Sequence, residues 1–497
     1  ATALRFLSSC GSGPKNQPGD LCFIDSSFVS AGANAVINCC NSAVTYTSCK
    51  LSSNSGNIIA NMTDAAQRIL KSEVSGKSGG IELLNDDTLP MTPEVDYTRD
   101  VVTKPKSKNY INITEAPYNA KENEDITAVL QKAIDDLKAT GGTVYIPSGI
   151  YYISEGIDVW AGIELRGAII SPAYAHRVAT GTKLYTSFGK NDPDGEALID
   201  LYEGSGLFGI GIIYHEQKTS SLTPYSYSIR GKGSNVYVID VSLSTSYNCI
   251  DFASYKCDNH YVEFVWGLAL KTGIKVGAGS ENGIIRDCHF TTNCWYDQSE
   301  PNAWNNVYQY MMDNSTTFLI GESKNEILYN NFTICIKTGI EITDGAQNVQ
   351  LLGNGVDSSD TAVLLSGNCT AYFVNSQLVN LRDSGGSAQY FDIVRTAENF
   401  TGGAYLFNTA TWGTTKCTYN LNGSGSLGII GGLTIRSENL ASVKNGEISF
   451  FSYSNNAGSS LKISDTAKKV YLSGNLFTTS LFNNMKKITQ ACGPDVE

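Results

Sequence analysis

The strongest constraint on the fold is a repeat of 22–24 residues in the middle of the chain. Short strands recur within it, and each is followed by a polar turn and a second strand. Five aligned strands begin at Ile250, Ile274, Phe318, Ile340 and Val363. Their starts are 24, 44, 22 and 23 residues apart, so the long step is one coil plus an insertion of similar length. A repeat of this length with two or three short strands is typical of a β-solenoid, whose coils stack about 4.8 Å apart.

The turns after these strands carry a recurring asparagine, which supports the same fold. Asparagine accepts a left-handed backbone, so we expect these side chains to stack from coil to coil. A leucine-rich repeat would need regular leucine positions, and a β-sandwich would show hairpin turns. We therefore predict an all-β, right-handed, single-stranded parallel β-helix over residues 107–497. The aligned asparagines are Asn235, Asn259, Asn282, Asn325 and Asn348.

A short helix is expected just before the first coil. Asp125 could cap it, and Gly141 and Gly142 would end it. Such a helix would cover the open end of the solenoid and its unpaired strand edge. The apolar residues at helical spacing are Ile126, Val129, Leu130, Ala133, Ile134 and Leu137.

Residues 1–106 form a Cys-rich N-terminal extension, with five of the chain's 13 cysteines in its first fifty residues. We expect most of the five to form disulfides in a secreted protein; scattered buried thiols are the alternative. Zinc is disfavoured, because no CxxC pair occurs. The odd total leaves a thiol that could link chains, so a homo-oligomer or filament through this extension is a further expectation. The first residues resemble a mature chain with any signal peptide removed. The five cysteines are Cys10, Cys22, Cys39, Cys40 and Cys49.

The overall charge argues against two classes of partner. The net charge is −12 and no lysine or arginine cluster occurs, which disfavours nucleic acid. No apolar run is long enough to span a membrane. The Asn-x-Ser/Thr sequons permit an extracellular glycoprotein. They begin at Asn61, Asn112, Asn314, Asn331, Asn368, Asn399 and Asn422.

Three segments resemble pectate-lyase-like β-helix proteins. They are ITAVLQKAIDDLKATGGTVYIPSGIYYI, GIELRGAI and IIRDCHF, and the similarity extends over about residues 107–480. The resemblance implies the fold and a carbohydrate ligand. It does not select an activity, because the superfamily includes glycosidases, lyases, esterases, tailspikes and structural proteins.

In a β-helix the chemistry must come from outward-facing side chains. The middle positions of the aligned strands are outward and include Asp251, Lys275 and Glu341. Asp251 lies seven residues before Asp258, a spacing that resembles lacto-N-biosidase-type β-helix glycosidases. Two carboxylates held close can act as acid and nucleophile, so we predict Asp251 and Asp258 as a catalytic pair of a retaining enzyme. A solvated sheet face with ordinary charges is the alternative.

The inserted segment Thr291 to Thr317 is rich in aromatic residues, which suit the apolar faces of sugars. We expect it to border the groove that holds Lys275 and Glu341, with His215 on the same face. The alternative is that its rings pack on the solenoid wall. The predicted substrate contacts from this segment are Trp295, Tyr296 and Trp304.

These features leave three functions open. A secreted glycoside hydrolase is the leading interpretation, an extracellular structural or adhesive glycoprotein is the second, and a polysaccharide lyase is the third. A calcium-dependent lyase would need clustered aspartates, but Asp240 and Asp287 align with Asn330 as a polar ladder, with Arg286 beside them. No metal-ligand spacing, phosphate-binding loop or Ser-His-Asp order occurs, so neither a metal nor a cofactor is expected.

Overall fold

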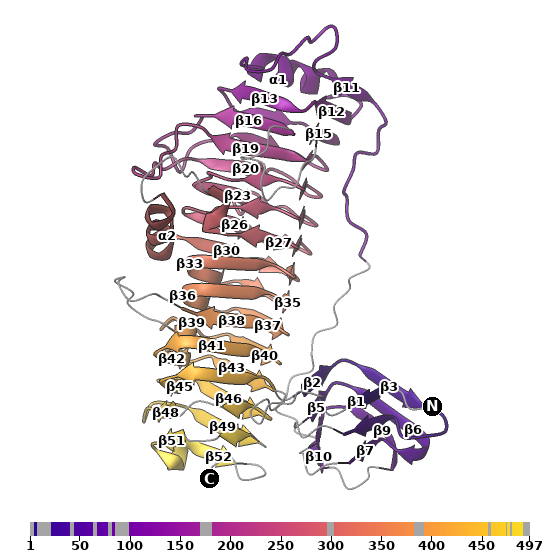
Figure 1. Cartoon of the computed structure of the whole chain (residues 1–497), viewed down its shortest axis with the longest axis vertical. Coiled ribbons are helices and arrows are strands. Elements are labelled where there is room, and N and C mark those ends of the chain that lie inside the picture. Colours follow the sequence, from indigo (N-terminus) through magenta and orange to yellow (C-terminus); the bar gives the residue numbers. More distant parts are fainter. Residues whose placement is uncertain are drawn as a thin grey trace, which may run out of the picture.

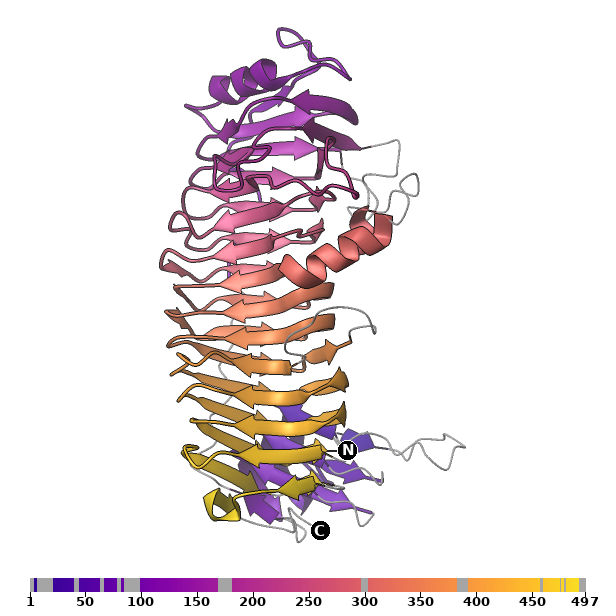
Figure 2. The same ribbon diagram turned by 90° about the vertical axis from the view of Figure 1, so that its left-hand side faces the viewer.

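The computed structural model describes residues 4–6, 21–39, 44–62, 67–77, 82–84, 99–168, 181–295, 303–381, 392–455, 459–473, 475–477 and 480–490. From β11 (Tyr110–Asn112) to β52 (Ile488–Gln490) the chain winds into one long β-helix (Figures 1 and 2). The strands that stack along its axis pair in parallel. The predicted β-helix is therefore confirmed.

Each coil contributes to three faces. Face A is the 15-stranded sheet, and faces B and C are the two alternating sets of strands in the 24-stranded sheet. In one coil, β21 (Tyr237–Ile239) lies in face A, β22 (Ser242–Leu243) in face B and β23 (Asn248–Phe252) in face C. The next coil repeats this order with β24 (Tyr261–Glu263), β25 (Trp266–Gly267) and β26 (Thr272–Val276).

The strands that revealed the repeat lie side by side on face C. Ile250 is in register with Ile274, Ile274 with Phe318, Phe318 with Ile340, and Ile340 with Val363. All five side chains are buried in the main core. The alternation of apolar and polar residues along each strand therefore decides which side chains face outward.

The predicted asparagine ladder is present at the corner that precedes face A. Asn235, Asn259, Asn282, Asn325 and Asn348 all have a left-handed backbone, with φ between 54° and 62°. The Nδ2 of Asn325 donates to Asn282 Oδ1 at 3.1 Å, and that of Asn348 donates to Asn325 Oδ1 at 2.8 Å. These bonds tie successive coils together.

Helix α1 (Thr127–Asp136) lies at the N-terminal end of the β-helix (Figure 1). Its buried residues are Leu130, Ala133 and Ile134, and the Thr127 backbone N–H donates to Asp125 Oδ1 at 2.9 Å. No helix in the described ranges is long and apolar enough to cross a membrane.

The N-terminal extension forms a second, small solenoid. Its ten short strands, from β1 (Leu4–Phe6) to β10 (Glu82–Leu84), pair in parallel in three sheets. The register joins Leu21 to Val44 and Val44 to Gln67, so the coils repeat at 23 residues. A small core of its own contains Tyr46, Leu51, Ile58 and Ile69, among others. This repeat was not predicted from the sequence, where only a Cys-rich region was expected.

The disulfides expected in this extension are not seen among its described cysteines. Cys22, Cys39 and Cys49 are free thiols, while Cys10 and Cys40 lie outside the described residues. Cys49 is buried, and its Sγ lies 3.3 Å from the Thr47 carbonyl oxygen and 3.4 Å from that of Phe23. These cysteines occupy β-solenoid positions, where neighbouring coils hold them without a covalent link.

The small solenoid lies against face A near the C-terminal end of the β-helix (Figure 1). Leu70 packs with Phe407, Ile430 and Phe451 in one apolar cluster. A Cβ added to Gly431 would lie 2.9 Å from Cys22 Sγ, so the contact is close. The homo-oligomer or filament through this extension stays a prediction.

The segment before β11 also packs on face A. Val101 and Val102 contact an apolar cluster there, and Arg99 Nη1 donates to the Asn282 carbonyl oxygen at 2.7 Å. The segment from Arg99 onward therefore runs along the face that the small solenoid covers farther down.

Candidate functional site

The outward column predicted on face C exists. In register it includes Arg230, Asp251, Lys275 and Glu341, with Leu319 between the last two. Lys275 and Glu341 are both half-buried and are separated by two coils, or about 10 Å. Burial raises the pKa of Glu341, which accepts a 3.5 Å hydrogen bond from the Thr316 hydroxyl.

Asp251 is not solvent-facing, contrary to our expectation. Only 1% of its surface is exposed, and Arg230 Nε lies 3.1 Å from its Oδ2. The carboxylate also accepts the backbone N–H groups of Ala253 and Ser254 and the Ser254 hydroxyl. A carboxylate with an ion pair and three further donors is satisfied by the fold itself.

Asp258 faces different partners. Its Oδ1 accepts the Glu281 backbone N–H at 2.8 Å, and its Oδ2 lies 3.0 Å from Lys256 Nζ. Within the described residues, no hydrogen bond or ion pair joins it to Asp251. The catalytic pairing of these two residues stays a prediction, which the observed contacts do not favour.

The aromatic insertion divides between core and surface. Trp295, at the end of η2 (Thr292–Trp295), is 7% exposed and belongs to the main core. Trp304, on α2 (Ala303–Asn314), is half-buried and stacks on Tyr308 with ring centroids 4.9 Å apart. Tyr296 lies outside the described residues. The rings described here therefore pack mainly on the molecule itself.

His215 lies on face B rather than on face C, so it does not share a face with Lys275 and Glu341; its contact with substrate stays a prediction. It follows β19 (Ile210–Tyr214) and is exposed. Its ring contacts Tyr152 and Tyr185, with centroids 5.5 and 6.0 Å away.

Face C also holds carboxylates that sequence reasoning missed. Burial, with Asp360 nearby, raises the pKa of Asp392 to about 6, while a 2.7 Å hydrogen bond from Asn420 lowers it. Asp360 and Asp392 are 5% and 3% exposed. Asp392 comes after the five strands that the repeat aligns, so its place on face C was not predicted.

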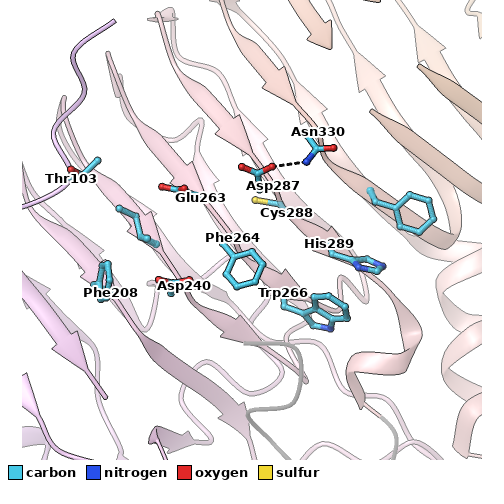
Figure 3. A pocket seen from close by; sticks show the side chains of 12 residues that line it. Thr103, Phe208, Asp240, Glu263, Phe264, Trp266, Asp287, Cys288, His289 and Asn330 are labelled. Carbon is cyan, nitrogen blue, oxygen red and sulfur yellow. Dashed lines mark hydrogen bonds between the residues drawn. The ribbon is translucent and has the colours of Figure 1, made fainter. Parts of the chain in front are cut away.

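The clearest concave surface lies at the corner between faces A and B, and we call it the corner groove (Figure 3). Its volume is about 760 Å³. It lies on consecutive coils and combines three carboxylates with several aromatic rings. Its lining residues are Thr103, Phe208, Ile239, Asp240, Glu263, Phe264, Trp266, Asp287, Cys288, His289, Asn330 and Phe332.

A one-residue turn on each coil forms the rim of this groove. Asp240, Phe264, Asp287 and Asn330 occupy equivalent turn positions, with φ of 53° or 54°. Asparagine and aspartate tolerate this left-handed backbone, but a bulky aromatic residue rarely adopts it. Phe264 is 42% exposed, so its ring is held in an unfavourable backbone conformation and presented to solvent.

The carboxylates of the groove differ in how they are held. Both oxygens of Asp287 are occupied, one by Arg286 Nε and one by Asn330 Nδ2, each at 2.7 Å. Glu263 Oε2 accepts the Tyr261 hydroxyl at 2.8 Å. No hydrogen bond reaches the Asp240 carboxylate within the described residues. Asp240 is therefore the carboxylate best placed to bind a ligand.

Burial raises the pKa of Asp240, and the charge of Glu263 raises it further, whereas Arg166 lowers it. The two carboxylates lie on neighbouring coils, because Ile239 is in register with Glu263. A carboxyl group whose pKa is raised can hold a proton that it later donates, as a general acid must.

The floor of the groove is aromatic. The rings of Trp266 and His289 lie 4.1 Å apart, and His289 meets Phe332 edge to face at 5.0 Å. Burial lowers the pKa of His289 to about 4, so this ring is neutral at ordinary pH. Trp266 Nε1 is buried and has no hydrogen-bond partner among the described residues.

Asp240, Asp287 and Asn330 were predicted from the sequence as one polar ladder, but Phe264 was not recognised as part of it. The phenylalanine occupies the same turn position one coil after Asp240, where a small or polar residue is expected. This exception in the ladder is the sequence feature that could have indicated the site. Among the described residues, no three His, Cys, Asp or Glu side chains gather as metal ligands.

Comparisons with known proteins agree with this fold. The family model "Rhamnogalacturonase A/epimerase, pectate lyase-like" matches residues 110–386. The DFA-IIIase of Arthrobacter chlorophenolicus A6, solved in complex with DFA-III, superposes with a TM-score of 0.51 at 10% identity, over 78% of this chain and 99% of that one. The catalytic unit of the GH87 α-1,3-glucanase of Streptomyces thermodiastaticus strain HF3-3 gives 0.50 at 14% identity, over 77% and 71%. No curated protein sequence matches the chain.

Proposed function

This chain belongs to the pectate lyase-like family of rhamnogalacturonase A and epimerases, and we propose that it is a secreted glycoside hydrolase whose substrate binds in the corner groove. The exposed ring of Phe264, held in a left-handed turn between carboxylates, is the observation that carries this proposal. A fold retains such strain where function uses it.

The groove has the chemical character that a glycan needs. Sugars present apolar C–H faces, which stack on aromatic rings such as Phe264 and Trp266. Their hydroxyl groups need hydrogen-bond partners, which the carboxylates of Asp240 and Glu263 supply. The pectate lyase-like β-helix family is carbohydrate-active, and the corner groove combines the aromatic rings and carboxylates that a sugar chain needs.

For hydrolysis, Asp240 acts as the general acid because its pKa is raised. Its proton passes to the glycosidic oxygen as the bond between that oxygen and the anomeric carbon breaks. Glu263 either attacks the anomeric carbon or takes a proton from the attacking water, according to the separation of the two carboxyl groups. Water adds across the cleaved bond. Its hydroxyl group ends on the anomeric carbon, and the other sugar leaves with a free hydroxyl group.

The alternatives predict different behaviour. A structural or adhesive glycoprotein would bind a glycan in this groove without cleaving it. A polysaccharide lyase would need a basic residue, Lys275 or Arg286, facing the substrate. Arg286 is held by Asp287 and lies over the Tyr329 ring, and Lys275 lies on face C, outside the corner groove. The arrangement around Arg286 therefore supports the hydrolase over the lyase.

The test measures new reducing ends from soluble rhamnogalacturonan, α-1,3-glucan, inulin and dextran. Wild-type protein should cleave at least one, and Asp240→Asn and Glu263→Gln should each lower the rate by about 10²–10⁴-fold. Asp258→Asn is the matched control and should retain activity. If no polysaccharide is cleaved, or if Asp392→Asn abolishes activity and Asp240→Asn does not, the corner groove is not the active site.

Secretion and N-glycosylation remain part of this proposal. Asn368 and Asn399 are exposed and could carry glycans. Asn331 could not, because its side chain is buried and its Nδ2 donates to the Ile285 carbonyl oxygen at 2.9 Å. Mass spectrometry of protein expressed through a eukaryotic secretory pathway should find glycans at exposed sequons and none at Asn331.

A further inference from the structure

The turn ladder that forms the rim of the corner groove continues well beyond it. After Asn330 it passes through Gly353, Asn375 and Asn408 to Gly431, all with left-handed backbones. The backbone N–H of each ladder residue donates to the carbonyl group just before the next one, from Asp240 onward. The corner is therefore one continuous edge of the β-helix.

The character of this edge changes along its length. The half nearer α1 carries the carboxylates of the groove, while the half nearer the C-terminus carries amides and glycines. Asn330, Asn375 and Gln377 are exposed, and so is Gly353. A Cβ at Gly353 would meet no atom of the described residues within 4 Å, so none of them covers the edge there.

The amides along the edge are already aligned with one another. Asn408 Nδ2 donates to Asn375 Oδ1 at 2.9 Å, in the same way that Asn330 Nδ2 donates to Asp287 Oδ1. Such rows retain free hydrogen-bonding capacity, because each amide has two N–H groups and two acceptor positions on its oxygen. Uncharged donors and acceptors repeated along one line match the hydroxyl groups of an extended sugar chain.

The small N-terminal solenoid closes this edge. At Gly431, the rung after Asn408, Cys22 Sγ lies 2.9 Å from the position of a Cβ. The open edge thus extends from the corner groove to the side of the small solenoid. From Asp287 to Asn408 it crosses four coil steps, or about 19 Å.

We infer that this edge is a glycan track, in which Asn375, Gln377 and Asn408 bind sugar residues beyond the corner groove and the small solenoid forms the end wall. The inference rests on the proposed function and specifies its substrate as a long polysaccharide rather than a disaccharide. The bound chain runs parallel to the axis of the β-helix, with its cleaved bond at Asp240 and Glu263.

The experiment uses the full chain in affinity gel electrophoresis with the same four polysaccharides in the gel. Asn375→Gly combined with Gln377→Ala removes two amides and leaves the left-handed turn unstrained. The affinity for a retarding polysaccharide should fall about tenfold, the loss expected for two hydrogen bonds. Cleavage of its short oligosaccharides, which the corner groove alone can hold, should be unchanged.

Asn305→Ala with Gln309→Ala is the matched control, since both residues are exposed on α2. The track is refuted if the edge variant binds polysaccharide as tightly as the wild type while Phe264→Gly weakens binding; the proposed glycan groove would then stand. If neither the edge variant nor Phe264→Gly changes binding or cleavage, both the track and the proposed function are wrong.

Discussion

His260 Nε2 lies 2.9 Å from Glu326 Oε1, and both side chains are completely buried. The two residues are 66 positions apart in sequence, and the coil between them has Gly283 at the equivalent position. A Cβ at Gly283 would lie 2.1 Å from His260 Cε1 and 2.5 Å from Glu326 Oε2. The missing side chain on the middle coil is what allows the pair to meet.

Gly283→Ala should therefore destabilise the β-helix by about 3 kcal/mol, because the methyl group forces the buried pair apart. The thermal unfolding midpoint measures this effect. Gly32→Ala is the control, since nothing lies within 4 Å of its Cβ position, and it should leave the midpoint unchanged. Equal unfolding midpoints for the two variants would contradict this prediction, because the buried pair of His260 and Glu326 would then accommodate the methyl group without loss of stability.

The same pair predicts a pH dependence of stability. Burial lowers the pKa of His260, but the charge and hydrogen bond of Glu326 and the bond to the Cys257 carbonyl raise it by more, so the net shift is upward. A raised histidine pKa stabilises the fold fully below the unfolded value of about 6.5, and this contribution is lost as pH rises through the folded value.

The midpoint of the wild type should thus exceed that of Glu326→Gln at pH 6, and the gap should narrow as pH rises above 6.5. His289 does not interfere in this range, because burial lowers its pKa to about 4. A difference between the two unfolding midpoints that stays constant up to pH 9 would contradict the raised pKa of His260.

Phe264→Gly should separate binding from stability. Glycine relieves the left-handed backbone, which costs a phenylalanine about 1 kcal/mol, and this gain offsets the lost burial of the ring. The unfolding midpoint should change little, while affinity for a retarding polysaccharide falls about tenfold. Ser452→Gly, in the same turn ladder, should leave affinity unchanged.

The repeat was predictable because inward and outward residues alternate on strands such as β26, where Ile274 and Val276 are buried and Lys275 is not. The register of Ile250, Ile274 and Phe318 follows from that alternation alone. The burial of Asp251 does not, because it depends on Arg230 of the preceding coil, and the loops that set this register vary in length. The N-terminal solenoid, whose 23-residue coils enclose a core of their own, was missed because its cysteines were interpreted as disulfide partners.

Labelling the cysteines of the N-terminal solenoid tests whether they are free thiols or form disulfides. Cys22, Cys39 and Cys49 should all react with iodoacetamide when the protein is denatured without reductant. In the native protein Cys22 should react slowly, because burial raises its pKa to about 12. If denatured, unreduced protein shows these three cysteines unlabelled, the disulfide prediction is right and the free thiols are wrong.

Asp251 and Asp258 should differ sharply when each is changed to asparagine. Asp251→Asn removes one partner of a buried ion pair and leaves Arg230, which is 9% exposed, without its nearest carboxylate. Such a loss costs about 3–5 kcal/mol, so the unfolding midpoint should fall markedly. Asp258 is half-buried and pairs with the exposed Lys256, so Asp258→Asn should cost less than about 1 kcal/mol.

Activity measured at temperatures well below each variant's unfolding midpoint then shows whether Asp251 and Asp258 have a structural or a catalytic role. If Asp251 is structural, folded Asp251→Asn protein keeps the rate of the wild type, and Asp258→Asn does so at all temperatures where the wild type is active. If both variants stay folded yet lose turnover, the pair predicted from sequence is catalytic, and Asp240 and Glu263 are not.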